Sequence, residues 1–239
     1  MKNILFLCVI FLCAITLSFA KVIKVGTNAT YPPFEFFDKN GKIIGFDADL
    51  LDSISKDTGL KFELIDLPFD GLVANLASGK VDMVISALSI TDERKQKVNF
   101  SNPYFQHTVL LLVQKNNNKI NGVKDLKNNI KLGVETGSAQ EKYAQQFKDI
   151  QLLFYDNVEI YTALETGKVD AILMDNSPAL YYIKNKKNPK IKVVGEPVNP
   201  KDVGIAIPKG DKKLLDTINN SLSSIKKSGE YETLYKKWF

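Results

Sequence analysis

The residues with the clearest chemical potential lie in one short segment, residues 86–94, which follows an apolar run at residues 81–85. The segment holds two serines, a threonine and Arg94, the only arginine among 32 basic residues. A guanidinium can grip a carboxylate through two parallel hydrogen bonds, whereas a lysine ammonium acts as a point charge. A single arginine in a lysine-rich chain therefore predicts a clamp for an anionic group.

The position of this segment supports a ligand-binding role. Ser89 or Thr91 can cap a short helical turn at residues 92–94, which leaves backbone N–H groups free for an anion. In open α/β sheets, ligands lie beyond the carboxyl ends of strands, and the segment follows a predicted strand. The alternative is a surface Arg94 paired with its acidic neighbours, Asp92 or Glu93.

Two further groups follow predicted strands in the second half of the chain. Gly137 and Ser138 open a predicted helix over residues 138–147, whose first N–H groups could face an anion, although an ordinary capped helix is the alternative. Asp175 ends an apolar run at residues 171–174. Its carboxylate could hold an ammonium group, or it could cap the next helix.

Aromatic side chains could form the walls of a site. Tyr31 begins a Tyr-Pro-Pro-Phe sequence that cannot be helical, and Phe69 stands at a predicted helix start after Pro68. Either ring could instead belong to the core. Together with Arg94 they predict a cleft with apolar walls and few polar anchors, which is typical of a small-molecule site.

Strand-like and helix-like segments alternate along the chain, which predicts an α/β fold with largely parallel sheets. A helix begins near Asp47, its expected N-cap, and ends at Gly59. Residues 76–82 recur in similar form at residues 164–170, which predicts two related lobes, although chance recurrence is the alternative. Apolar runs at residues 109–113 and 204–207 are the expected pair of crossover strands.

Composition excludes several classes of protein. The chain has 239 residues, of which 44% are hydrophobic and 25% charged, as in ordinary globular proteins. The net charge of +5 comes from scattered lysines, so we expect no nucleic-acid partner. With one histidine, His107, and cysteines only at Cys8 and Cys13, the sequence predicts no metal site, no disulfide in the mature chain and no cofactor.

Residues 1–20 have the features of a secretory signal peptide. Lys2 precedes an apolar run, and small residues stand before the expected cleavage point after Ala20. An uncleaved anchor helix is the alternative; no small residue stands just before either cysteine, which disfavours lipidation. We therefore expect a periplasmic or otherwise extracytoplasmic protein that is secreted through a cleavable leader.

Several motifs occur together in a specific order and spacing, at residues 26–35, 45–50, 69–72, 89–94, 100–104, 133–140 and 170–175. Through them the mature chain resembles, over nearly its whole length, the polar amino-acid solute-binding proteins of ABC importers. The resemblance implies a two-lobed, type II periplasmic-binding-protein-like fold. The expected lobes are residues 21–108 with 203–239, and residues 109–202, with hinge strands at the ends of the second lobe.

The resemblance also implies roles for individual residues. Arg94 and the N–H groups of Ser89 and Ser138 would hold the ligand α-carboxylate. Asp175, with Ser86 and Ser89, would hold the α-ammonium, and Tyr31 and Phe69 would flank the side chain. The full predicted ligand-binding set is Asn28, Tyr31, Phe69, Ser86, Ala87, Leu88, Ser89, Arg94, Gly137, Ser138, Ala139, Gln140 and Asp175.

The chain departs from the family pattern at positions that bear on specificity. Asn28 stands where binders of basic amino acids often carry an acid, and Ala87 and Ala139 stand where some members carry a hydroxyl. Glu35 could supply a negative charge instead. We expect a polar or basic L-amino acid, such as arginine, lysine, histidine or glutamine, rather than glutamate or aspartate.

The resemblance predicts a monomer that delivers its ligand to the membrane permease of an ABC importer. A dehydratase-type enzyme on the same fold is the alternative, and it would need a general acid or base in the cleft. A ligand-sensing domain is the third interpretation.

Overall fold

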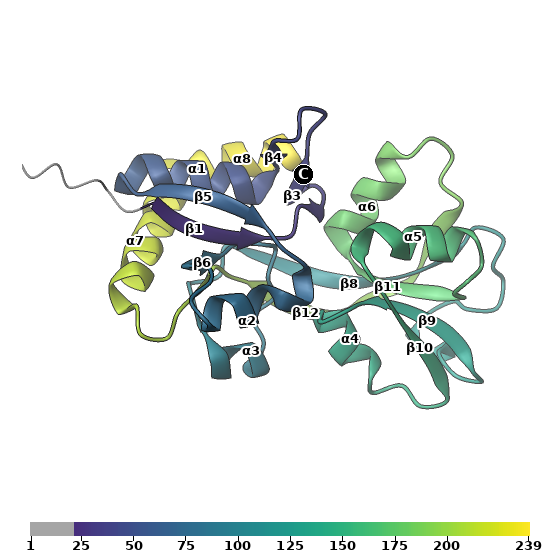
Figure 1. The fold of residues 1–239 in the computed structure, drawn as a ribbon. Helices are drawn as coiled ribbons and strands as arrows, with labels where there is room; N and C mark the ends of the chain where they lie inside the picture. Colours follow the sequence, from purple (N-terminus) through teal and green to yellow (C-terminus); the bar gives the residue numbers. More distant parts are fainter. Residues whose placement is uncertain (1–21) are drawn as a thin grey trace, which may run out of the picture.

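The computed structural model describes residues 22–239. The predicted leader, its cleavage point and both cysteines lie outside the described residues. The described chain forms two α/β lobes joined by long strands (Figure 1). This arrangement confirms the predicted fold class.

The first lobe is built on a five-stranded sheet with the order β5-β1-β6-β13-β7, and a small sheet β2-β3-β4 lies beside it. Strand β1 pairs in parallel with both β5 and β6, so their carboxyl ends meet at one edge. The strands are β1 (Val22–Thr27), β2 (Thr30–Tyr31), β3 (Glu35–Phe37), β4 (Ile43–Ile44), β5 (Lys61–Asp66), β6 (Met83–Val84), β7 (Asn99–Phe100) and β13 (Ala206–Ile207). The helices are α1 (Phe46–Thr58), the 3-10 turn η1 (Phe69–Gly71), α2 (Leu72–Ala77), α3 (Asp92–Lys97), α7 (Lys212–Ser228) and α8 (Glu230–Trp238).

The second lobe has a sheet with the order β10-β9-β11-β8-β12. Its parallel strands β9, β10 and β11 again end at a common edge. The strands are β8 (Phe105–Gln114), β9 (Ile130–Glu135), β10 (Ile150–Tyr155), β11 (Ala171–Asp175) and β12 (Ile191–Val203). The helices are the 3-10 turn η2 (Val123–Asp125), α4 (Ala139–Ala144), α5 (Asn157–Glu165) and α6 (Asn176–Asn185).

The repeated sequence at residues 76–82 and 164–170 has the same structure in both lobes. In the first lobe, the Asp82 carboxylate accepts the Lys24 N–H at 2.9 Å, and the Asp82 N–H donates to the Lys24 carbonyl at 2.8 Å. Asp170 makes the same two bonds with Lys131, each at 2.8 Å. In each lobe a helix, a left-handed glycine and an aspartate thus align one strand with the next. The prediction of two related lobes is confirmed.

The crossover strands differ in part from the prediction. Strand β8 contains the expected run at residues 109–113, but its antiparallel partner is β12, in which Val198 lies opposite Val109. The predicted run at residues 204–207 contributes β13, which pairs with β6 and β7 of the first lobe. Strand β12 was missed because it is irregular, lies at a sheet edge and is half exposed. The exact lobe boundaries stay a prediction.

Asp47 does not cap the helix that follows it, so that prediction was wrong. Helix α1 begins at Phe46 with Gly45 in the N-cap position, and Gly59 ends it in the left-handed conformation as expected. Burial leaves the Asp47 carboxylate inside the lobe, where it accepts the Ala87 N–H at 2.7 Å and the Tyr104 hydroxyl at 2.9 Å. Two other predicted elements are shorter in the structure, since α4 ends at Ala144 and β6 spans only two residues.

An aromatic cluster packs the end of the chain against the start of β8. The rings of Phe34, Phe105 and Phe239 lie 4.9–5.1 Å apart. Such contacts tie the crossover strand to the first lobe. Within residues 22–239, no helix combines the length and the apolar character needed to cross a bilayer.

Candidate functional site

Polar side chains from both lobes meet at the junction between the lobes, where Tyr31 contacts Asp175 and Arg94 contacts Gly137. The first lobe contributes Tyr31, the loop at residues 86–89 after β6, and Arg94 from α3. The second lobe contributes Asp175 at the end of β11 and the start of α4. The fold therefore brings together the residues on which the sequence prediction depended.

Arg94 lies between the lobes and is only 9% exposed. Its Nη1 donates to the Ser89 carbonyl at 2.7 Å, and its Nη2 donates to the Gly137 carbonyl of the other lobe at 3.0 Å. The guanidinium lies over the Phe69 ring, 5.4 Å from its centroid. Burial lowers the pKa of Arg94 to about 10, so the group stays charged at neutral pH.

Arg94 is buried, so it is not the surface arginine of the alternative interpretation. Asp92 pairs with Lys95, at 3.9 Å, and not with Arg94. Thr91 caps α3 by accepting the Arg94 N–H at 3.2 Å, as one of the two predicted caps. The cap fixes the start of the helix, and the guanidinium then points to the junction between the lobes.

The loop at residues 86–89 is held from inside the first lobe. The Ser86 hydroxyl accepts the Asn28 N–H at 3.0 Å and donates to Glu35 at 2.8 Å. Ala87 has a positive φ of 43°, and its N–H is bound by Asp47. Burial raises the pKa of Asp47 to about 7 and that of Glu35 well above its usual range.

Three predicted residues point away from a direct ligand role. The Asn28 amide donates to the Leu67 carbonyl at 2.9 Å and accepts the Thr30 hydroxyl at 2.6 Å, so both ends of the amide are engaged. Leu88 is fully buried in the core of the first lobe. Glu35 is 1% exposed and is bonded to Ser86, and burial raises its pKa well above the usual range, which disfavours a negative charge there.

The start of α4 is an ordinary capped helix. Ser138 accepts the Glu141 N–H at 3.0 Å, and the Glu141 carboxylate accepts the Gly137 N–H at 2.7 Å. Ala139 and Gln140 are buried beside them. The structure thus shows the cap, and it places Gly137 against Arg94 of the other lobe. A contact of this helix start with an anion stays a prediction.

Asp175 occupies the N-cap position of α6 but makes no capping hydrogen bond. Its carboxylate instead accepts the Tyr31 hydroxyl at 2.8 Å, across the junction, and lies 3.7 Å from Nε2 of His107. Burial lowers the pKa of His107, which favours the neutral imidazole. The side chain of Asp175 thus faces the junction, as the ligand interpretation expects.

The sequence prediction missed Glu135, the last residue of β9, which is 7% exposed. Burial raises the pKa of Glu135 to about 8; the nearby charge of Asp175 raises it further, and that of Arg94 opposes the rise. A signal was present in the sequence, since an acidic residue ends a buried strand directly before Gly137. Within the described chain, no group of acidic or histidine side chains could hold a metal ion.

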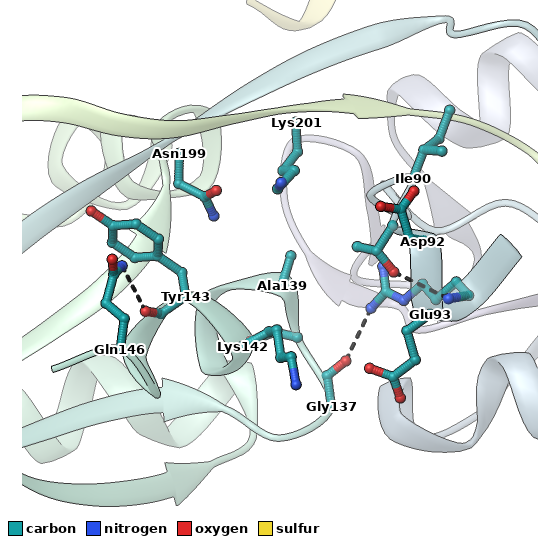
Figure 2. A pocket seen from close by; sticks show the side chains of 13 residues that line it. Ile90, Asp92, Glu93, Gly137, Ala139, Lys142, Tyr143, Gln146, Asn199 and Lys201 are labelled. Carbon is teal, nitrogen blue, oxygen red and sulfur yellow. Dashed lines mark hydrogen bonds between the residues drawn. The ribbon is translucent and has the colours of Figure 1, made fainter. Parts of the chain in front are cut away.

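Two cavities border the junction. One, of about 510 Å³, lies between α3, α4 and β12. Figure 2 shows Lys142, Asn199 and Lys201 around it, and the dashed line that ends at the Gly137 carbonyl marks the hydrogen bond that Arg94 donates. The other, of about 410 Å³, is lined by Thr30 of the first lobe and by α5 and α6 of the second, including Tyr161. Residues of both lobes line each cavity.

The lobes are closed on each other. Besides the contacts of Arg94 and Tyr31, the Asn157 amide donates to the Thr30 carbonyl. Gly137, with a φ of 73°, approaches Asp70 so closely that a Cβ atom there would lie 2.9 Å from the Asp70 Cα. The geometry is that of a two-lobed clamp with a cationic group and carboxylates at its centre.

Comparisons with known proteins agree with this geometry. An ancestral arginine-binding protein bound to arginine is 42% identical, with a TM-score of 0.87, over 91% of this chain and 98% of that one. The arginine-, lysine-, histidine-binding protein ArtJ from Geobacillus stearothermophilus is 38% identical, with a TM-score of 0.85, over 92% and 95%. The L-cystine-binding protein TcyJ of Escherichia coli K12 is 36% identical over 90% of this chain and 81% of its own length. Residues 23–239 match the bacterial extracellular solute-binding proteins, family 3, and the chain belongs to that family.

Proposed function

We propose that this protein binds an L-amino acid between its two lobes outside the cytoplasm and delivers it to the membrane permease of an ABC importer. The observation that carries the proposal is the pair of opposite charges at the lobe junction. Arg94 of the first lobe and Asp175 of the second are both buried there. A zwitterionic α-amino acid carries the complementary pair of charges.

The two charges suggest how the ligand is oriented. Arg94 has five N–H donors, of which two are used by the carbonyls of Ser89 and Gly137, so others remain for the α-carboxylate. Asp175 would accept the α-ammonium. Tyr31 and Phe69 lie next to these groups and would cover the ligand side chain.

The ligand side chain is proposed to be polar or basic, as in arginine, lysine, histidine or glutamine. The names of the relatives favour such ligands, although they include cystine as well. Glutamate and aspartate would bring a further negative charge next to Asp175 and Glu135. We propose that the protein works as a monomer after removal of the leader.

Isothermal titration calorimetry of the chain from Lys21 onward, with the twenty amino acids, tests the function directly. We expect one ligand per chain. Arg94→Lys should weaken binding by about 2 kcal/mol or more, because a lysine ammonium cannot replace a planar guanidinium that contacts both lobes and the ligand carboxylate. Lys95→Ala, which removes an exposed cation of the same helix, is the matched control. Unchanged binding by Arg94→Lys would exclude this assignment of the carboxylate.

A dehydratase-type enzyme is the second candidate, because a buried carboxyl group with a raised pKa, such as Glu135, can donate a proton. Incubation with an aromatic hydroxy-acid precursor, followed by mass spectrometry, separates the two candidates. A binding protein should return the compound unchanged, whereas catalytic conversion would establish an enzyme.

A further inference from the structure

We propose that Glu135, together with the Tyr161 hydroxyl, binds a cationic side chain of the amino-acid ligand and so sets the specificity of the site. This inference rests on the proposed function, since it concerns the same cleft. The charge that selects the ligand side chain then lies in the second lobe. From the sequence we had considered Asn28 and Glu35 of the first lobe for this role.

The fold directs Glu135 towards the lobe junction. Side chains alternate along a strand, so Leu132 and Val134 share one face of β9, where both are buried in the core of the second lobe. Glu135 points to the other face. There it is close enough to Arg94, Asp175 and Tyr161 for their charges to act on one another.

Both proposed groups are buried without a hydrogen-bonding partner. Glu135 is 7% exposed, and no residue in the range 22–239 donates a hydrogen bond to its carboxyl group or forms an ion pair with it. Tyr161 is 5% exposed, and its hydroxyl likewise has no partner among those residues. Buried polar groups in proteins are nearly always satisfied, so this pair points to a donor supplied by the ligand.

Arg94 does not neutralise Glu135. Its guanidinium is held by the carbonyls of Ser89 and Gly137, and no ion pair joins it to a carboxylate of the described chain. A bound α-carboxylate would balance Arg94, and an α-ammonium would balance Asp175. A carboxylate at Glu135 is then without a partner, and a cationic side chain would favour that carboxylate and balance it.

In the first lobe, the carboxyl groups of Glu35 and Asp47 are 1% exposed and are bonded to the loop at residues 86–89, so they lie behind that loop. Asn28 uses its amide on Leu67 and Thr30, and Glu35 is bonded to Ser86. A guanidinium suits the second lobe well, because its planar donors can serve a carboxylate and a neighbouring hydroxyl together. Arginine is therefore the preferred ligand class.

The test compares arginine with citrulline, which has nearly the same shape but no charge. Calorimetry on the unmutated protein should show about 100-fold tighter binding of arginine, the scale of a buried charge-assisted pair. In Glu135→Gln we expect this ratio to fall to within a few-fold, with citrulline binding retained. Asp156→Asn is the matched control, because it removes an exposed carboxylate near Glu135, and it should keep the ratio.

Tyr161→Phe provides a second test in case Glu135→Gln does not fold. It removes one hydroxyl and should reduce the arginine affinity by about three- to tenfold, and the citrulline affinity by less. Equal binding of arginine and citrulline by the unmutated protein, or an unchanged ratio in Glu135→Gln, would overturn the proposal. Failure of the unmutated protein to bind any amino acid would instead overturn the proposed function.

Discussion

At the residue scale, the candidate site is defined by ionisable groups that are buried at the lobe junction. Arg94 keeps its charge despite burial, because nearby carboxylates oppose the cost of desolvation. Glu135 responds in the opposite way, since burial and Asp175 both favour its protonated form. The two groups therefore differ in how their charge will depend on pH and ligand.

We expect the affinity for arginine to rise with pH up to about 8 and then to level off. Burial raises the pKa of Glu135 to about 8, so the free protein carries a proton there at pH 7. A bound cation favours the carboxylate, so binding releases that proton and the dissociation constant falls, by at most about tenfold per pH unit, as pH rises. The ionisable groups close enough to interact with Glu135 are Arg94, Asp175, Asp156, Glu35, Tyr31 and Tyr161.

Calorimetry at three pH values between 6 and 8 measures this dependence. Glu135→Gln is the control, because it has no proton to release at this position and its profile should be flat. If the arginine dissociation constant of the unmutated protein does not change between pH 6 and 8, and its pH profile matches that of Glu135→Gln, the expectation is wrong.

At the element scale, helix α1 and strand β3 hold the loop that precedes α3. Asp47 of α1 binds the Ala87 N–H, and Glu35 of β3 binds Ser86. The strained left-handed conformation of Ala87 is thus maintained by a carboxylate from another element. The conformation of the loop at residues 86–89 therefore depends on its contacts with α1 and β3, and not only on the sequence of the loop.

Asp47→Asn should make the stability of the protein less dependent on pH. Burial raises the pKa of Asp47 from its ordinary value of 3.8 to about 7. The folded state therefore binds more protons than the unfolded state between these values, and the free energy of unfolding falls as pH rises through them, by at most about 1.4 kcal/mol per unit. Asparagine keeps the acceptor for Ala87 but does not titrate.

Urea unfolding at pH 5 and pH 7 provides the measurement. The difference between the two pH values should be smaller in Asp47→Asn than in the unmutated protein. Asp52→Asn changes an exposed aspartate of the same helix and should leave the difference as it was. An equal difference in all three proteins would argue against a buried proton at Asp47.

At the scale of the whole molecule, strands β8 and β12 are paired, and we expect the two lobes to close about them. Several contacts across the junction are made by residues of the proposed site, namely Tyr31 with Asp175 and Arg94 with Gly137. Closure and ligand binding should therefore be coupled. Hinged domains of this kind move through a small number of residues at element ends.

Gly137→Ala should weaken both ligand binding and lobe closure. A Cβ atom at this position would lie 2.9 Å from the Asp70 Cα, so the closed lobes could not approach as they do here. Gly41→Ala is the matched control, because Gly41 has a similar φ of 77° and open space around it. Both variants carry the strain of a left-handed alanine, about 1 kcal/mol.

Small-angle scattering with and without ligand tests this coupling. The radius of gyration of the unmutated protein and of Gly41→Ala should fall when ligand is added. In Gly137→Ala the fall should be smaller at saturating ligand. Full closure of Gly137→Ala would show that the glycine is not needed for the approach of the lobes.

Local patterns in the sequence were enough to determine the alternating elements and the two related lobes, and they singled out Arg94, which the structure places at the lobe junction. Each of these features depends on residues close together in the chain and can be recognised from the sequence. Examples are a capped turn, a strand followed by a helix and the repeated Gly-Lys-Val-Asp. Only the tertiary structure showed the surroundings of Asp47 and Glu135 and the pairing of β12 with β8. Those features depend on burial and on contacts between residues far apart in sequence. Burial and nearby charges shift the pKa of a carboxyl group, and the residues next to it in the chain do not show what will surround it in the fold.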